Sequence, residues 1–251
     1  MKKNIFYLLS HQDDEFGVFI NISKQIINYN VYIFYLTSGY DKKIHKSNLS
    51  VRDKESIKVL TKIGVNKKNI IFLGKTLDIR CNLLYLNLPK IYNKLNLFSK
   101  LVIPHMIVTH SWEGGHEDHD ACNLIARKIA FKFNIVNISK EFSLYNAFRC
   151  KLFYFKVFNP IQKKGVISKT NFLKRLLYIK LLFVYKSQFK IWIGLYPFVI
   201  FHYFFYGYNF MEKLNNSKNI KKPHSGKLLY EVRDLCTFKE FKDKTNFFMK
   251  L

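Results

Sequence analysis

The residues best suited to chemistry form a short cluster near the start of the sequence. His11, Asp13, Asp14 and Glu15 follow an apolar segment and place an imidazole beside three carboxylates. Carboxylates this close repel one another unless a cation or hydrogen bonds hold them. In a chain with 17 acidic residues against 42 basic ones, this concentration indicates a divalent metal site with nitrogen and oxygen ligands. The alternative, capping of the following helix, explains one acid and leaves His11 and the other acids unexplained.

A second cluster lies between His110 and Asp120. It contains three histidines and four acidic residues, and Gly114 and Gly115 allow its backbone to turn tightly. A single histidine in this segment could be an ordinary surface or core residue. That interpretation does not explain why so many histidines and acids lie together. Together the two clusters supply the ligands of a catalytic zinc site, in which three protein groups leave one position for water.

Strand-like and helix-like segments alternate around these clusters. The alternation predicts a mainly parallel α/β sheet flanked by helices. Ligands bind beyond the carboxyl ends of the strands in such sheets, and both clusters follow expected strands. The expected strands cover residues 5–10, 31–37, 70–73, 101–108 and 142–145, and the expected helices cover 15–28, 52–63, 88–97 and 119–133.

The order of these motifs resembles that of the PIG-L / LmbE-like N-acetylglucosaminyl deacetylase family. Residues 11–15 (His-Gln-Asp-Asp-Glu) are similar to its HPDDE signature, and residues 115–119 (Gly-His-Glu-Asp-His) are similar to its GHxDH motif. The agreement covers residues 5–130, half of the chain. Weaker similarities lie at residues 37–39, 52–65, 72–78, 113–120 and 228–231.

The resemblance implies a Rossmann-like fold and a bound Zn²⁺ or another divalent metal. By position, His11, Asp14 and His119 would bind the metal. Asp13 would act as the general base, and His116 would stabilise the oxyanion or protonate the leaving amine. Substrate contacts are predicted for Arg52, Asp78, His110 and Asp118.

Two positions leave alternatives open. Gln12 stands where the family has proline, so the turn loses a conformational constraint but no metal ligand. An active enzyme is expected, with a degenerate, inactive relative as the alternative. For Arg52, a surface ion pair with Glu55 or Glu15 explains the residue equally well.

The formal charge of +25 indicates attraction to polyanions, anionic lipids or phosphorylated substrates. Lysines are dispersed along a chain rich in Asn, Ile, Phe and Tyr, which favours a compositional bias instead. No basic stripe or nucleic-acid-binding motif is present, so a nucleic-acid partner is not expected. The four scattered cysteines predict free thiols, and the apolar run 5–9 is too short for a signal peptide, so a cytoplasmic protein is predicted.

The predicted catalytic core covers residues 1–150, and residues 151–251 are expected to form an aromatic-rich, mostly helical extension that packs on it. Residues 189–206 are interpreted as a buried or interfacial helix rather than a membrane span. Residues 227–232 are predicted to form a short strand or ordered tail. For residues 172–210, packing on the core is preferred to peripheral contact with an anionic membrane. The oligomeric state is left open.

The two clusters predict a metal-dependent hydrolase, and the resemblance implies that it removes an N-acetyl group from an amino sugar in a glycan, glycolipid or sugar conjugate. A divalent ion lowers the pKa of a bound water to about 7 and polarises a carbonyl, which meets two needs of amide hydrolysis. The alternatives are an amidase acting on a non-sugar substrate and a catalytically impaired metal- or glycan-binding relative.

Overall fold

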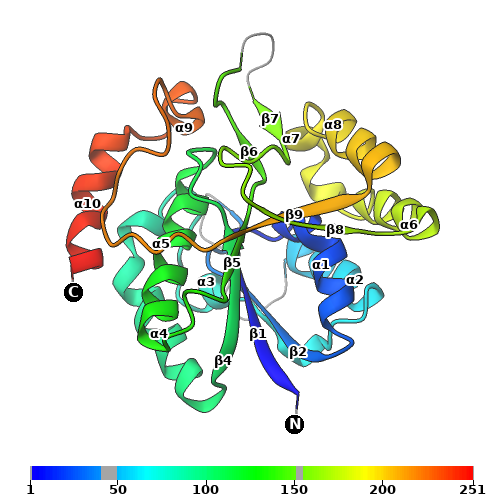
Figure 1. Ribbon diagram of the computed structural model, residues 1–251, viewed down its shortest axis with the longest axis horizontal. Coiled ribbons are helices and arrows are strands. Elements are labelled where there is room, and N and C mark those ends of the chain that lie inside the picture. Colours follow the sequence, from blue (N-terminus) through cyan, green and yellow to red (C-terminus); the bar gives the residue numbers. More distant parts are fainter. Residues whose placement is uncertain (1, 41–49, 151–154, 251) are drawn as a thin grey trace.

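The computed structural model describes residues 2–40, 50–150 and 155–250. Its centre is a seven-stranded sheet with the order β3-β2-β1-β4-β5-β9-β8 (Figure 1). The first five strands in this order are parallel, and β9 pairs antiparallel with β5 and β8. The predicted mainly parallel α/β sheet is confirmed, and the order of its parallel part is Rossmann-like. The strands are β1 (Lys3–Leu9), β2 (Tyr29–Tyr35), β3 (Ile70–Ile71), β4 (Pro104–His110), β5 (Lys140–Phe142), β8 (Gly165–Lys169) and β9 (Tyr208–Lys213), and a separate hairpin pairs β6 (Tyr145–Asn146) with β7 (Lys156–Val157).

Helices cover both faces of the sheet (Figure 1). Alternate side chains of β1 enter two cores, with Tyr7 in one and Phe6 in the other, because strand side chains point to opposite faces. The core that holds Tyr7 includes residues of α1 (Phe19–Gln25), α2 (Val51–Lys62), α6 (Phe172–Leu182), α7 (Phe189–Trp192) and α8 (Tyr196–Phe201). The core that holds Phe6 includes residues of α3 (Leu73–Thr76), α4 (Leu88–Leu101), α5 (Glu117–Lys132) and α10 (Phe238–Lys250).

The helix predicted for residues 15–28 begins differently. A 3-10 turn covers Asp14–Val18, and only then does α1 follow. The reason lies in the turn before it, where Asp13 adopts a φ of 125°, outside the helical range. The Asp14 carboxylate accepts the backbone N–H groups of Ser10 and His11 and holds this turn against the end of β1. Further short turns are the 3-10 segments Lys67–Asn69, Leu84–Leu86 and Lys186–Gln188 and the π-helical segment His202–Tyr206.

The C-terminal part, residues 151–251, does more than pack on the core, because its strands β8 and β9 continue the central sheet beyond β5. These two added strands were not predicted from the sequence. Residues 189–206, predicted as one buried or interfacial helix, are helical but divided into α7, α8 and the π-helical turn. No helix in the described ranges is long and apolar enough to cross a membrane.

Of the two alternatives predicted for residues 227–232, the short strand is wrong, since Leu229–Val232 forms a short helix, α9, in an ordered segment. Glu231 accepts the N–H groups of Leu228 at 2.7 Å and Phe238 at 2.9 Å, which caps the helix start and fixes the chain after it. The N–H of Leu229 donates to the Gly114 carbonyl at 2.8 Å. This hydrogen bond connects the start of α9 to the loop that carries the second cluster.

Candidate active site and metal centre

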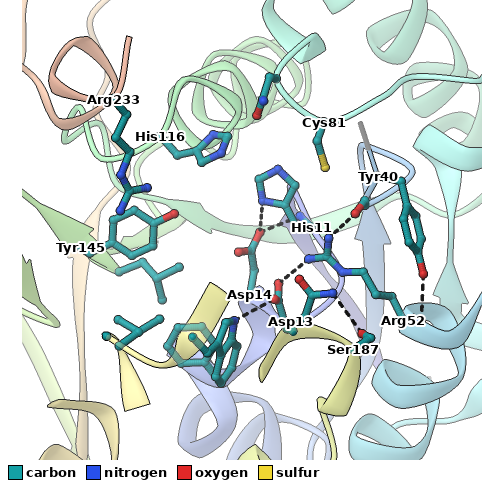
Figure 2. Close-up of a pocket in the computed structure, with 18 of the residues that line it drawn as sticks. His11, Asp13, Asp14, Tyr40, Arg52, Cys81, His116, Tyr145, Ser187 and Arg233 are labelled. Carbon is teal, nitrogen blue, oxygen red and sulfur yellow. Dashed lines mark hydrogen bonds and ion pairs between the residues drawn. The ribbon is translucent and has the colours of Figure 1, made fainter. Parts of the chain in front are cut away.

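The two clusters meet at the carboxyl ends of β1 and β4, the central strands of the sheet. The chain turns away from β1 toward β2 and from β4 toward β5, so a crevice opens between their loops. A pocket of about 560 Å³ lies there (Figure 2). Its lining includes His11, Asp13, Asp14 and His116, with further residues from the C-terminal part. Both clusters thus lie where the order of strands and helices predicted them.

His11, Asp14 and His119 converge, as expected from the sequence. One ring nitrogen or carboxylate oxygen from each lies within 4.8 Å of the others. His119 Nε2 is 3.2 Å from Asp14 Oδ1, yet both nitrogens of this buried ring lack a hydrogen-bond partner among the described residues. Buried polar atoms are rarely left unpaired, and a cation between the ring and the carboxylate would give Nε2 a partner. The donor set fits Zn²⁺ or another divalent ion with similar preferences.

Asp118 orients His11 for this role. Its Oδ2 lies 2.9 Å from His11 Nε2, and its carboxylate also accepts the N–H groups of Asn82 at 2.7 Å and Leu84 at 3.0 Å. With the Nε2 hydrogen donated to Asp118, the Nδ1 lone pair of His11 is left for a cation, 3.6 Å from Asp14 Oδ2. His11, His116 and Asp118 form a second close group. That group is the weaker site, because the Asp118 carboxylate already has three partners.

Both oxygens of Asp13 are held by donors. Arg52 Nη2 donates to Oδ1 at 3.1 Å (Figure 2). Trp192 Nε1 donates to Oδ2 at 3.0 Å. Burial raises the pKa of Asp13 to about 7, against the opposing effect of the Arg52 charge. A carboxylate with a pKa near neutrality is able to accept a proton and return it, as a general base must.

Electrostatics keep two of the three converging groups, Asp14 and His119, in the forms that bind a cation, whereas the acidic neighbours of His11 raise its pKa despite its burial, so that this ring must release a proton on binding. Burial alone would raise the pKa of Asp14, but the imidazoles of His119, His110 and His11 hold it well below its ordinary value. Burial lowers the pKa of His119 to about 3. The carboxylate is therefore charged and the imidazole neutral near pH 7, which are the states of metal ligands.

His116 borders the same pocket, with its ring centroid 4.8 Å from that of His11. Burial, with the neighbouring imidazoles of His11 and His119, lowers the pKa of His116 well below its usual value. Its Nδ1 accepts the N–H of Asp118 at 3.1 Å at the start of α5. The neutral ring therefore carries its hydrogen on Nε2 and is a donor at that atom.

Comparison with protein families decides the assignment. The model of the PIG-L family, described as GlcNAc-PI de-N-acetylase, matches residues 6–130. The chain belongs to the PIG-L family. The matched residues contain all three converging groups, Asp13 and His116, and they cover both acid-histidine motifs on which the resemblance rests.

Several solved structures share the fold of this PIG-L protein. The zinc-inhibited form of teicoplanin deacetylase is 15% identical, with a TM-score of 0.59, 83% of this chain covered and 96% of that one. N,N'-diacetylchitobiose deacetylase from Pyrococcus horikoshii is 20% identical, with a TM-score of 0.58 and coverage of 84% and 83%. The A40926 pseudoaglycone deacetylase is 15% identical, with a TM-score of 0.57 and coverage of 86% and 100%. No curated protein gives a significant sequence match.

Of the four residues predicted to contact substrate in this PIG-L protein, only Arg52 lines the pocket. Because Arg52 is buried and pairs with Asp13, the alternative of a surface ion pair with Glu55 or Glu15 is wrong.

Asp78, His110 and Asp118 lie outside the pocket lining. Asp78 is exposed. His110 is buried behind the converging groups, with its ring stacked 3.9 Å from that of His119 and its Nε2 3.1 Å from Asp14. Asp118 is fully buried against His11. The structure therefore gives these residues no contact with the cavity, and His110 and Asp118 support the converging groups instead.

Two aromatic residues and one arginine are among the lining residues that were not predicted from the sequence. Trp192 comes from α7, and Tyr145 begins the short strand β6. Arg233 follows α9, with its guanidinium 5.7 Å from the centre of the Tyr145 ring. No spacing or motif connects them to the two clusters, because Trp192 and Arg233 reach the pocket through the folding of residues 151–251 and Tyr145 through the β6–β7 hairpin.

Gln12, which stands where the family has proline, is held by hydrogen bonds. Its Nε2 donates to the Ser38 carbonyl at 3.2 Å and to Asp53 Oδ1 at 2.9 Å. Arg52 donates to the Gln12 carbonyl through Nε at 3.2 Å and Nη2 at 2.9 Å. Gly39 adopts a φ of +78° beside it, and a Cβ there would lie 2.0 Å from Gln12 Oε1. The turn that presents Asp13 is thus held in place without proline.

Proposed function

We propose that this protein is a metal-dependent hydrolase that removes an N-acetyl group from an amino sugar in a glycan, glycolipid or sugar conjugate. The observation that carries the proposal is the convergence of His11, Asp14 and His119 beside Asp13 and His116 at one pocket. The family description, GlcNAc-PI de-N-acetylase, supports it. The structural neighbours, which include deacetylases of teicoplanin biosynthesis and of N,N'-diacetylchitobiose, support it as well.

Each part of the reaction has a candidate group. A divalent ion held by His11, Asp14 and His119 would supply Lewis-acid chemistry for water and carbonyl. Asp13, oriented by Arg52 and Trp192, accepts a proton from the attacking water. His116 donates through Nε2 to the negative charge that develops on the carbonyl oxygen. The proton held by Asp13 then passes to the leaving amine.

The pocket suits a ligand with both polar and apolar surface. A volume of about 560 Å³ lies within the range of about 300–1,000 Å³ usual for small-molecule sites. Tyr145, Phe155 and Trp192 offer ring faces, while Asn82 and Arg233 offer hydrogen-bond donors. A sugar ring has hydroxyl groups at its edge and apolar C–H groups on its face, so this lining supports a sugar over a purely apolar amide.

The test is acetate release by the Zn²⁺-loaded protein from a panel of N-acetylated amino sugars and non-sugar amides. Asp13→Asn is expected to retain metal and lose turnover by about 10²–10⁴-fold. Asp14→Ala is expected to lose metal, and Asp243→Asn, at an exposed acid of α10, serves as the matched control. Normal deacetylation by both site variants would contradict the assignment. Metal and sugar binding without any acetate release would favour the impaired relative.

A further inference from the structure

The chain contains no acidic residue between Glu141 and Glu212. These 70 residues include eleven lysines and arginines. A general lysine bias adds positive charge along a whole chain but does not remove acids from one segment. The segment therefore has a local excess of positive charge that the composition of the protein does not explain, and this charge attracts an anionic surface.

The same segment leaves large aromatic side chains in solvent. Phe201 is 51% exposed, Phe205 58% and Tyr206 53%. Ring contacts join Phe201 to Phe205 at 4.5 Å, Phe205 to Phe204 at 5.0 Å and Phe204 to Phe172 at 5.6 Å. These rings form one connected group rather than scattered exposed residues, and such patches mark interaction sites. We call this group the aromatic face: Phe172, Phe201, Phe204, Phe205 and Tyr206.

The aromatic face reaches the mouth of the candidate active site. Phe198 precedes Phe201 by three residues on α8, so the two lie on neighbouring positions of one helix side. The Phe198 ring is 6.0 Å from that of Phe155, which lines the pocket. Leu195 also lines the pocket, and Ile193 near it is 67% exposed. In Figure 1, α6, α7 and α8 gather at one side of the molecule, opposite α10.

Only the inner side of these helices packs on the core. Tyr178, Leu182 and Tyr203 are buried against the sheet, which accounts for the stability of the segment. The outer side combines the aromatic face with exposed lysines on the same elements, including Lys174 and Lys190. Packing on the core, the interpretation preferred from the sequence, therefore accounts for the inner side of these helices and leaves the outer side unexplained.

We propose that the aromatic face docks this protein on the surface of an anionic membrane, with the mouth of the pocket beside the lipid. Aromatic and aliphatic side chains enter the boundary between headgroups and acyl chains, while lysines pair with lipid phosphates. The contact is peripheral. A second copy of the chain fits less well, because two basic faces without acids would repel each other across the interface.

The test is flotation of the full-length protein with vesicles of phosphatidylcholine, with and without phosphatidylglycerol. Binding is expected to anionic vesicles at low salt and to be released by high salt. Phe201→Ser/Phe205→Ser is expected to reduce the bound fraction about tenfold. Lys174→Glu/Lys190→Glu is expected to reduce it by at least about tenfold.

The matched controls are Phe247→Ser and Lys100→Glu, at exposed positions on α10 and α4. Thermal unfolding of every variant verifies that each is folded. Absence of flotation at low salt, or an equal loss in the controls, would refute the docking. Two other outcomes would also contradict the proposal. A dimer that dissociates in the Phe201→Ser/Phe205→Ser variant would assign the aromatic face to a second copy of the chain. Retention on single-stranded DNA without flotation would assign it to nucleic acid.

Vesicle binding is measured without substrate, so it does not depend on the proposed function. Acetate release from a water-soluble substrate is expected to be unchanged in all four substitutions on this face, because none of these residues lines the pocket. If the wild-type protein deacetylates its substrate but does not float with vesicles, the docking alone is rejected. Flotation without deacetylation would reject the proposed function alone.

Discussion

The indole Nε1 of Trp192 donates to Asp13 Oδ2 at 3.0 Å, across 179 residues of sequence. The other oxygen of Asp13 accepts from Arg52 at 3.1 Å. The candidate base is therefore oriented by a cation from α2 and by a neutral donor from α7. The C-terminal part, which the family model does not cover, completes the site that the N-terminal half begins.

Trp192→Phe is expected to lower kcat about tenfold, since a hydrogen bond to a charged group contributes about 1.5–3 kcal/mol. A donor to a carboxylate stabilises its charged form, so loss of the indole N–H raises the pKa of Asp13. The acidic limb of the pH–rate profile should then move to higher pH. Trp112→Phe is the control, because its Nε1 donates to the Lys221 carbonyl outside the pocket. An unchanged profile in Trp192→Phe would show that the contact has no role in orienting the base.

Asp118→Asn is expected to weaken Zn²⁺ binding by about 10–100-fold, because the Asp118 carboxylate orients His11 through its Nε2 hydrogen. Titration of the metal against a chelator measures the change, and thermal unfolding verifies the fold. Asp243→Asn should leave the affinity unchanged. A direct contact between Asp118 and substrate, as predicted from the sequence, would instead raise KM at unchanged metal affinity.

Local patterns were sufficient for the elements that carry the two clusters. The helix expected over residues 52–63 is α2, Val51–Lys62, because Ser50 and Asp53 form a capping box at its start. Convergence of His11 and His119 followed from fold class, since parallel strands bring their carboxyl ends to one edge of the sheet. These inferences need only short-range spacing and one topological rule.

The rest of the fold and of the candidate site depends on contacts between residues that are distant in the sequence. Local spacing does not predict such contacts. β9 joins the sheet by pairing Glu212 with Glu141, and neither segment alone predicts the other. β8 is an edge strand with mostly exposed side chains, so it lacks the alternation that marks a half-buried strand. Trp192 lies among many aromatic residues, and nothing in its neighbourhood distinguishes it as the one that reaches Asp13.

Lys75→Met is expected to destabilise the protein by about 3–5 kcal/mol, because it leaves a buried charge unpaired. Lys75 Nζ lies 2.6 Å from the fully buried Asp53, whose carboxylate also accepts from Gln12. Urea unfolding measures the change, with Lys62→Met at an exposed position of α2 as the control. The double variant Asp53→Asn/Lys75→Met should recover part of the loss, since it removes the unpaired charge. Equal stability of Lys75→Met and Lys62→Met would show that the pair contributes nothing.

Glu212 lies directly opposite Glu141 in the sheet. Burial, together with the carboxylates of Glu141 and Glu113, raises the pKa of Glu212 to about 8. Its pKa in the unfolded chain is about 4.3. The folded state therefore binds the proton more tightly, and the contribution of Glu212 to stability is present below about pH 4.3 and is lost as the pH rises toward about 8.

Glu212→Gln removes this titration while keeping the shape of the side chain. Its free energy of unfolding is expected to exceed that of the wild-type protein at pH 8 and to match it near pH 4, because only the ionised glutamate is penalised in the folded state. Urea unfolding across this range measures the difference, with Asp243→Asn as a control at an exposed acid. A difference that stays constant with pH would mean that Glu212 ionises in the folded protein as it does in the unfolded chain.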